Sequence, residues 1–239
     1  MPLITSILIH YQRSENMKKI IEGIRHQTIQ SDIIVWDNSG DCPGDGVDVM
    51  IRSSHNFHCL PRVLIAGTVK TEYIYNQDDD LAINDKFLFE KFITMSKRYP
   101  DYVIGWNGRQ FHKDINWEKA YSFPNKGSGG GWWDYAPIEN ETSIDMINFG
   151  VSFLRTELIN QIKINPFVLG YTEEEYKYGD DIIISSQLQK KRTMDFKLLS
   201  NYEWLNEFEN RGGALSKQSR HMVVRDELCR RIWEKKYNG

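Results

Sequence analysis

Residues 72–80 have the sequence Glu-Tyr-Ile-Tyr-Asn-Gln-Asp-Asp-Asp, a short apolar run that leads directly into three consecutive aspartates. A run of this length with aromatic and β-branched residues is typical of a buried strand, here Glu72–Tyr75. Neighbouring carboxylates repel one another, so a soluble protein gains little by placing three of them at the end of such a strand. The stretch therefore predicts a buried strand whose end carries a polar functional site.

Strand and helix patterns alternate on both sides of this run. Further strands are predicted at Leu3–Ile9, Ile33–Trp36, Val47–Ile51 and Tyr102–Trp106. Helices are predicted at Phe87–Met95, from Pro61 to about Val69, and after Ser14, a candidate cap for a helix that buries Met17, Ile20, Ile21 and Ile24. Such repeats favour right-handed crossovers, so we predict an α/β, Rossmann-like fold with a mostly parallel central sheet and flanking helices.

The second half of the chain is less regular. The patterns predict a strand over Ile144–Leu154, interrupted by Gly150, and helices over Asp180–Lys191 and about Ser219–Lys236. There is no visible linker, repeat or low-complexity tract. We therefore expect residues 1–239 to form a single domain.

Composition limits the class of protein. With 239 residues, 40% of them hydrophobic, the chain can form one sizeable core. Aromatic residues make up 13%, which suits either a core or the stacking of rings on sugars. The glycine-rich Lys126–Gly131, followed by Trp132 and Trp133, fits either a mobile lid with a sugar platform or an anchored surface loop. The net charge of −3 includes no basic excess, so no nucleic-acid partner is expected.

The cysteines and the first residues indicate the compartment. Cys42, Cys59 and Cys229 are odd in number and far apart, which fits neither a disulfide framework nor a zinc site. The run from Pro2 to His10 is apolar, but it is short and lacks a basic flank, so we interpret it as a strand. A cytoplasmic protein without a transmembrane segment is expected, and its oligomeric state stays open.

The aspartates Asp78-Asp79-Asp80 are the strongest chemical signal. Oxygen ligands suit Mn²⁺ or Mg²⁺, and a divalent cation would neutralise the cluster. Alternate residues of an extended segment point the same way, so Asp78 and Asp80 can face one metal ion. The alternative is a solvated acidic turn, which the apolar strand directly before the triplet disfavours.

Two further polar clusters follow predicted strands. His10-Tyr11-Gln12-Arg13 follows the first strand, and Asp37-Asn38 follows the second. The carboxyl ends of parallel strands share one edge of a sheet, and ligands of such sheets bind beyond that edge. We therefore expect these clusters and the aspartates to line one site.

Two pairs in the second half are candidates for chemistry. Asp180 and Asp181 open a predicted helix, where the helix dipole alone favours carboxylates. In the functional interpretation Asp181 deprotonates an acceptor hydroxyl or stabilises positive charge in the transition state. His221 and Arg225 lie four residues apart on one helix face, which is either a solvated face or a surface that meets phosphates.

Taken together, these positions resemble the GT-A glycosyltransferases, most closely the exostosin-type (GT64-like) catalytic domain, with GT2-like enzymes as broader relatives. The matching positions, in chain order, are Tyr11 and Arg13, Trp36-Asp37-Asn38-Ser39-Gly40, Asn56 and Arg62, Asp78-Asp79-Asp80, Phe149-Gly150-Val151-Ser152-Phe153, Gly179-Asp180-Asp181-Ile182, and His221-x-x-x-Arg225 with Cys229. The chain departs from the family pattern in three ways. Gly179 replaces a cysteine, one extra residue separates Asn56 from Arg62, and the membrane anchor of animal exostosins is not seen.

The resemblance implies a hexosyl- or pentosyltransferase that moves a sugar from a nucleotide-diphosphate donor, UDP-sugar above all, to a hydroxyl of a glycan or glycoconjugate. It implies Mn²⁺, or Mg²⁺, held by Asp80 and Asp78. It implies catalytic roles for Asp181, Arg225 and Asp180. It implies donor binding by Tyr11, Arg13, Asp37, Asn38, Asn56, Arg62, Asp78, Asp79 and His221. Residues 1–110 would then be a nucleotide-binding half, and residues 111–239 an acceptor-binding and catalytic half.

Two other functions fit parts of the pattern. A nucleotidyltransferase also combines a nucleotide-binding sheet with metal-binding carboxylates, but it usually carries a glycine-rich basic loop after the first strand, and here the first glycine is Gly23. A non-catalytic carbohydrate-binding module would explain the tryptophans but not the acidic clusters at strand ends.

Overall fold

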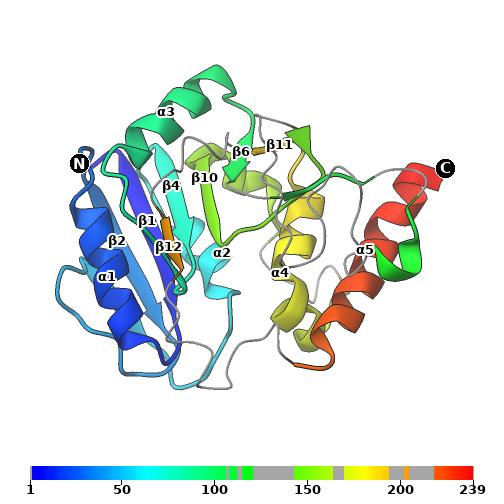
Figure 1. Cartoon of the computed structure of the whole chain (residues 1–239), viewed down its shortest axis with the longest axis horizontal. Helices are drawn as coiled ribbons and strands as arrows, with labels where there is room; N and C mark the ends of the chain where they lie inside the picture. Colours follow the sequence, from blue (N-terminus) through cyan, green and yellow to red (C-terminus); the bar gives the residue numbers. More distant parts are fainter. Residues whose placement is uncertain are drawn as a thin grey trace.

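An eight-stranded sheet forms the centre of the computed structural model (Figure 1). The structure describes residues 2–105, 108–111, 115–120, 143–163, 170–193, 202–204 and 218–238. The sheet order is β3-β2-β1-β4-β10-β6-β11-β8. In chain order these strands are β1 (Ile4–His10), β2 (Ser31–Asp37), β3 (Val49–Arg52), β4 (Tyr73–Gln77), β6 (Val103–Gly105), β8 (Ser143–Ile144), β10 (Val151–Arg155) and β11 (Lys191–Thr193).

Six of the eight strands run in one direction. The pairs β3-β2, β2-β1, β1-β4 and β6-β11 are parallel, whereas β10 is antiparallel to both β4 and β6, and β8 is antiparallel to β11. This confirms the predicted α/β class with a mostly parallel sheet. Because β10 runs in reverse, its first residue, Val151, pairs with Gln77 at the end of β4. The turn before β10 is thereby brought to the edge where the parallel strands end.

Helices cover both faces of the sheet because successive strand residues point to opposite sides. Ile4 and Leu8 of β1 belong to a core cluster with helices α1 (Ser14–Arg25) and α3 (Leu88–Arg98). Ile7 of β1 belongs to a second cluster. This second cluster includes helix α2 (Pro61–Ala66), the 3₁₀ helix η2 (Thr156–Gln161) and the C-terminal part of α4 (Glu173–Gln187).

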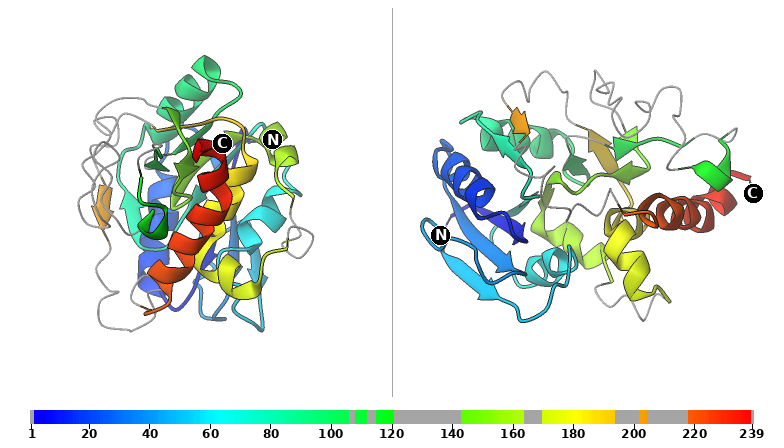
Figure 2. Two further views of the ribbon diagram at one scale, coloured as in Figure 1. Left: turned by 90° about the vertical axis from the view of Figure 1, so that its right-hand side faces the viewer. Right: turned by 60° about the horizontal axis from the view of Figure 1, so that its bottom comes forward.

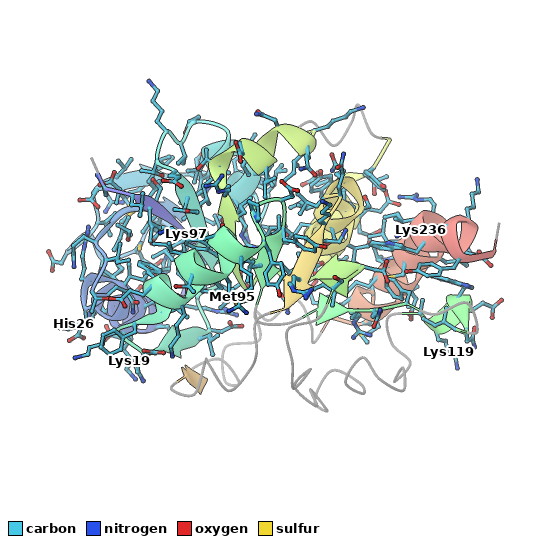
Figure 3. The ribbon with its side chains drawn as sticks, turned by 90° about the horizontal axis from the view of Figure 1, so that it is seen from above. Lys19, His26, Met95, Lys97, Lys119 and Lys236 are labelled. Carbon is cyan, nitrogen blue, oxygen red and sulfur yellow. The ribbon has the colours of Figure 1, made fainter. Side chains whose placement is uncertain are left out.

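Helices α4 and α5 (His221–Asn238) lie side by side at the end of the molecule away from α1 (Figure 2). Viewed from above, Lys19 and His26 mark the end near α1, and Lys119 and Lys236 mark the opposite end (Figure 3). A third core cluster joins these two helices with the 3₁₀ helix η1 (Trp117–Lys119). The backbone of α4 is not helical at Gly179 (φ −144°, ψ 32°), so the helix is broken just before Asp180 and Asp181.

The short strands complete the described fold. Strand β5 (Leu81–Ile83) pairs with β12 (Tyr202–Trp204), and β7 (Gly108–Arg109) pairs with β9 (Met146–Ile147). None of the helices in the described segments combines the length and the apolar character needed to cross a bilayer. Trp106, the glycine-rich segment 126–131 and Trp132-Trp133 lie outside the described residues, so the proposed lid is not tested.

Three of the predicted elements were wrong in detail. Ser14 is the first helical residue of α1 and not its cap; Arg13 takes the cap position, and the Ser14 hydroxyl donates to the Asp41 carbonyl at 2.9 Å. The strand expected over Ile144–Leu154, with its interruption at Gly150, is three strands: Asp145 separates β8 from β9, and the turn at Asn148–Gly150 separates β9 from β10.

The third error concerns the helix expected over Asp180–Lys191. It begins at Glu173, because Thr172 and Glu175 form a capping box, each bonding the other's backbone N–H. It ends at Gln187, and Lys191 begins a strand. The sequence Thr-x-x-Glu, a recognised helix start, occupies residues 172–175 and begins eight residues before Asp180.

Gly179→Ala should lower the free energy of unfolding by about 1–3 kcal/mol, because the new Cβ would lie 2.3 Å from Leu228 Cδ1 and overpack the contact between α4 and α5. Urea denaturation measures the change. Gly44→Ala is the matched control, since nothing lies within 4 Å of its added Cβ and its backbone is not left-handed. Equal stability of the two variants would contradict the packing of α4 against α5.

Candidate active site

Polar side chains gather at the sheet edge where β1, β2 and β4 end and β10 begins. Asp78, Asp79 and Asp80 follow β4 directly. Strand β10 fastens this segment, because the Asp78 N–H donates to the Gly150 carbonyl at 2.8 Å. The broken part of α4 brings Asp180 to the same edge, where its carboxylate lies 4.0 Å from Arg62. Asp180 therefore lies at the same sheet edge as the aspartate triplet.

Asp78 pairs with Arg62 of α2. The Arg62 guanidinium, only 3% exposed, donates to Asp78 Oδ1, and its other terminal nitrogen lies 4.0 Å from Asp180 Oδ2. Burial lowers the pKa of Arg62, but the neighbouring carboxylates outweigh it and raise the pKa, so this cation stays charged. Arg62 therefore links the triplet after β4 to the carboxylates of α4.

Asp79 points the other way, toward the loop after β1. Its carboxylate accepts hydrogen bonds from the Tyr11 N–H (3.1 Å) and from Arg13, and its backbone carbonyl accepts one from Asn16 (3.0 Å). Burial raises the pKa of Asp79, and the charge of Arg13 opposes that rise. With both carboxylate oxygens engaged, Asp79 ties the loop that carries Tyr11 and Arg13 to the end of β4.

Asp80 is the most accessible carboxylate of the triplet, with 41% of its side chain exposed. One terminal nitrogen of Arg13 lies 3.7 Å from its carboxylate. The protein atoms around it and the charges of Asp78 and Asp79 raise the pKa of Asp80 to about 7. The triplet is therefore incompletely neutralised by protein cations.

The second carboxylate pair lies between α4 and α5. Arg225 of α5 donates to Asp181 Oδ2 and to the Tyr178 carbonyl, both at 2.6 Å. Asp180 is 8% exposed, and its Oδ2 has no hydrogen-bond partner among the described residues. Burial and the charge of Asp181 raise the pKa of Asp180 to about 7.

Within the described part of the chain, the charges of this edge do not balance. Five carboxylates, from Asp78, Asp79, Asp80, Asp180 and Asp181, are paired with three guanidinium groups, from Arg13, Arg62 and Arg225. With every group ionised, these eight described side chains carry two excess negative charges. Burial first, and the neighbouring carboxylates second, raise the pKa values of Asp80 and Asp180. A hard divalent cation matches both the charge and the oxygen donors available from Asp78 and Asp80.

A family model described as the glycosyl transferase family 64 domain matches residues 3–237, which is nearly the whole chain. The chain is a family 64 glycosyltransferase domain. This confirms the resemblance to the exostosin-type enzymes. No curated protein sequence matches the chain significantly.

Two solved structures are similar to this family 64 domain. One is TarS from S. aureus, with 14% identity and a TM-score of 0.49, covering 80% of this chain and 35% of TarS. The other is the mannosyltransferase PcManGT from Pyrobaculum calidifontis in complex with GDP-Man and Mn²⁺, with 12% identity and a TM-score of 0.45. That match covers 81% of this chain and 57% of the mannosyltransferase. The family 64 domain thus spans about a third of the first protein and over half of the second.

In the family 64 domain, Asp37 organises a turn. His10 Nε2 accepts the Arg13 N–H at 3.0 Å, so His10 Nδ1 carries the ring proton and donates to Asp37 Oδ1 at 2.9 Å. Burial raises the pKa of Asp37, but hydrogen bonds from His10 and from the Ser39, Gly40 and Cys42 N–H groups outweigh it, so the pKa lies below its usual value. Asp37 is fully buried and turned to these donors.

The ligand atoms of His10, Asp37 and Asp41 lie within 4.8 Å of one another, close enough to hold a metal ion. The hydrogen bonds of His10 and Asp37 account for this group without one, since both ring nitrogens of His10 are already engaged.

Asn38 and Asn56 hold a second loop. Asn38 Oδ1 accepts from the Trp36 indole (3.1 Å) and from the Phe57 N–H (2.9 Å), while its Nδ2 donates to the His58 carbonyl (3.1 Å). Asn56 Oδ1 accepts the His58 N–H at 2.8 Å. The described contacts of Asn38 and Asn56 therefore shape the loop, and direct contact with a nucleotide stays a prediction for both residues.

Two residues close to this sheet edge were not predicted from their sequence pattern. Asn16 is 1% exposed and lies on the buried face of α1. A polar residue within an apolar helix face is the sequence feature that could have indicated its role. Asn148 precedes β10, and its nearness to Asp78 depends on the reversed strand. A sequence pattern carries no sign of that reversal.

His221, at the start of α5, is buried beside Tyr178, with ring centroids 6.0 Å apart. Burial, together with the charge of Arg225, lowers the pKa of His221 to about 4. The folded protein therefore resists protonation of this ring, and stability is lost as the pH falls from 6.5, the unfolded value, to about 4.

We expect His221→Gln to remove up to about 3 kcal/mol of this pH dependence. The measurement is the free energy of unfolding in urea at pH 7, 6, 5 and 4 for both proteins. The difference in the free energy of unfolding between the variant and the native protein should change steadily from pH 7 to pH 4. All other groups titrate in both proteins, so their contributions cancel in this difference. A difference independent of pH would show that folding does not lower the pKa of His221.

Proposed function

We propose that this domain transfers a sugar from a UDP-sugar donor to a hydroxyl of a glycan or glycoconjugate acceptor, with Mn²⁺ or Mg²⁺ bound by Asp78 and Asp80. The observation that carries the proposal is the excess of two negative charges at the sheet edge. A structural cluster would be expected to balance its charges, whereas a site that binds a cation and a diphosphate is incomplete without them. A bound cation would offset charge on the departing diphosphate.

The first 110 residues supply the proposed nucleotide-binding half. Tyr11 and Arg13 lie on the loop that Asp79 ties to the metal-binding segment, which supports a role in holding the nucleotide next to the cation. Asp37, Asn38 and Asn56 would act mainly by fixing the loops around the nucleotide. Neither rival function is favoured: a non-catalytic module does not need the carboxylates, and family membership disfavours a nucleotidyltransferase.

Residues 111–239 supply the proposed catalytic half. Asp181, oriented by Arg225, would face the reacting carbon and either accept the proton of the acceptor hydroxyl or stabilise positive charge on the sugar. Asp180, whose pKa near 7 leaves it partly protonated at neutral pH, would hydrogen-bond the donor together with Arg62. His221 stays neutral and would contact the donor only as an uncharged ring.

Asp80→Asn should abolish the Mn²⁺-dependent part of UDP binding, because the amide keeps the shape of the carboxylate but loses the charge that holds the cation. Isothermal titration of UDP with and without Mn²⁺ measures it, and we expect a loss of about 100-fold or more. Asp101→Asn is the control, since Asp101 is 69% exposed and precedes β6 at the opposite edge of the sheet. Unchanged UDP affinity of the Asp80 variant in Mn²⁺ would contradict the metal site.

Asp181→Asn should keep UDP binding within a few-fold and reduce kcat by about 100-fold or more, since the charge acts in the transition state. The readout is sugar transfer, or slow donor hydrolysis until an acceptor is found. Asp181 pairs with buried Arg225, so thermal melting must confirm that the variant is folded. A rise in KM with an unchanged kcat would make Asp181 a binding residue.

A further inference from the structure

Asn148 is a half-buried residue of the turn between β9 and β10, and neither the motifs nor the family resemblance includes it. The turn reaches the site because β10 enters the sheet in reverse and pairs Val151 with Gln77. The Asp78 N–H then donates to the Gly150 carbonyl, so the turn is bonded directly to the acidic segment.

Gly150 shows how close Asn148 and Asp78 are. A Cβ added to Gly150 would lie 3.0 Å from Asp78 Oδ2 and 3.1 Å from Asn148 Oδ1. Both oxygens therefore border the same small space, which remains open only because residue 150 has no side chain. The Asn148 carboxamide and the Asp78 carboxylate thus both border Gly150.

The Asn148 side chain has a fixed orientation and unused donors. Its Oδ1 accepts the Gly150 N–H at 2.8 Å, which requires the oxygen of the amide at that position. The nitrogen, Nδ2, therefore points elsewhere, and its two N–H donors have no hydrogen-bond partner among the described residues. A carboxamide with available N–H donors and a carboxylate that both border Gly150 suit a hydroxyl group, which can accept from the amide and donate to the acid.

The position of Asn148 indicates which part of a bound donor it would contact. Asp79 faces Tyr11 and Arg13, the side assigned above to the nucleotide. Asp78 instead faces Arg62, which leads toward Asp180 and the carboxylates proposed for catalysis. Asn148 borders Asp78 on this second side. In a donor that spans the site, the nucleotide lies on the first side and the sugar on the second.

We propose that Asn148 recognises the sugar being transferred, by donating a hydrogen bond from Nδ2 to a hydroxyl of that sugar beside Asp78. The inference rests on the proposed function and names a specificity-determining residue within it. The contact adds to the binding of the UDP-sugar but not to that of UDP.

The test compares UDP with four donors, UDP-glucose, UDP-galactose, UDP-GlcNAc and UDP-GalNAc, by isothermal titration in Mn²⁺. For the tightest donor, Asn148→Ala should reduce the affinity gain of UDP-sugar over UDP by about 3- to 10-fold and leave UDP itself within 2-fold. Asn148→Asp should lose the same gain while it keeps the oxygen that accepts the Gly150 N–H, so a misfolded turn cannot explain both results. Asn160→Ala, an exposed asparagine in η2 beyond the other end of β10, should change neither affinity.

Three outcomes would overturn the inference. An equal loss for UDP and UDP-sugar would place Asn148 on the nucleotide, and no loss for either would remove it from the donor site. Unchanged donor affinity with a raised KM for the acceptor would assign it to the acceptor. If the native protein does not bind UDP in Mn²⁺ at all, the proposed function fails first, and this inference fails with it.

Discussion

Repulsion among carboxylates is the constraint on which the described site depends. Asp78, Asp79, Asp80, Asp180 and Asp181 approach one another at one sheet edge, and the arginines that hold them come from three separate elements. Arg13 caps α1, Arg62 lies in α2 and Arg225 lies in α5. These contacts connect both faces of the sheet to the end of β4. A buried ion pair is often no more stable than a well-packed apolar pair, so this arrangement is better explained by ligand binding than by stability.

Strand geometry divides this edge into two sides. Consecutive residues at the end of β4 point in opposite directions, so Asp79 turns to the loop after β1, and Asp78 turns to Arg62. The same carboxylate run can therefore bind two different neighbours without any change in the backbone. The reversal of β10 adds a third neighbour, the turn at Asn148–Gly150. With this arrangement, one sheet edge can provide both the proposed nucleotide side and the proposed sugar side, so a second domain is not needed.

Much of the fold was predictable because buried strands leave continuous apolar runs. The predicted strand at Leu3–Ile9 differs from β1 by one residue at each end, and the shared edge for His10, Asp37 and Asp78 followed from parallel pairing alone. Distant contacts were not predictable in the same way. A nucleotide contact by Asp37 stays a prediction, and the structure adds that its carboxylate accepts hydrogen bonds from backbone N–H groups of its own turn. A sequence shows which polar residues lie near a site, but it does not show which of them form their hydrogen bonds within the loops.

Hydrogen bonds within the protein hold two loops at this sheet edge in unfavourable backbone conformations. Gln12 (φ 59°) and His58 (φ 54°) adopt the left-handed conformation, which is unfavourable for residues with a side chain, and they lie in the two loops nearest the predicted nucleotide site. Each is held by a hydrogen bond, from the Gln12 N–H to Ser39 Oγ at 2.8 Å and from the His58 N–H to Asn56 Oδ1 at 2.8 Å. Loops fixed in advance lose little entropy when a ligand binds, so more of the contact energy remains as affinity. The buried Asp37 and Asn38 therefore keep both loops in one conformation, and their own polar atoms face the protein.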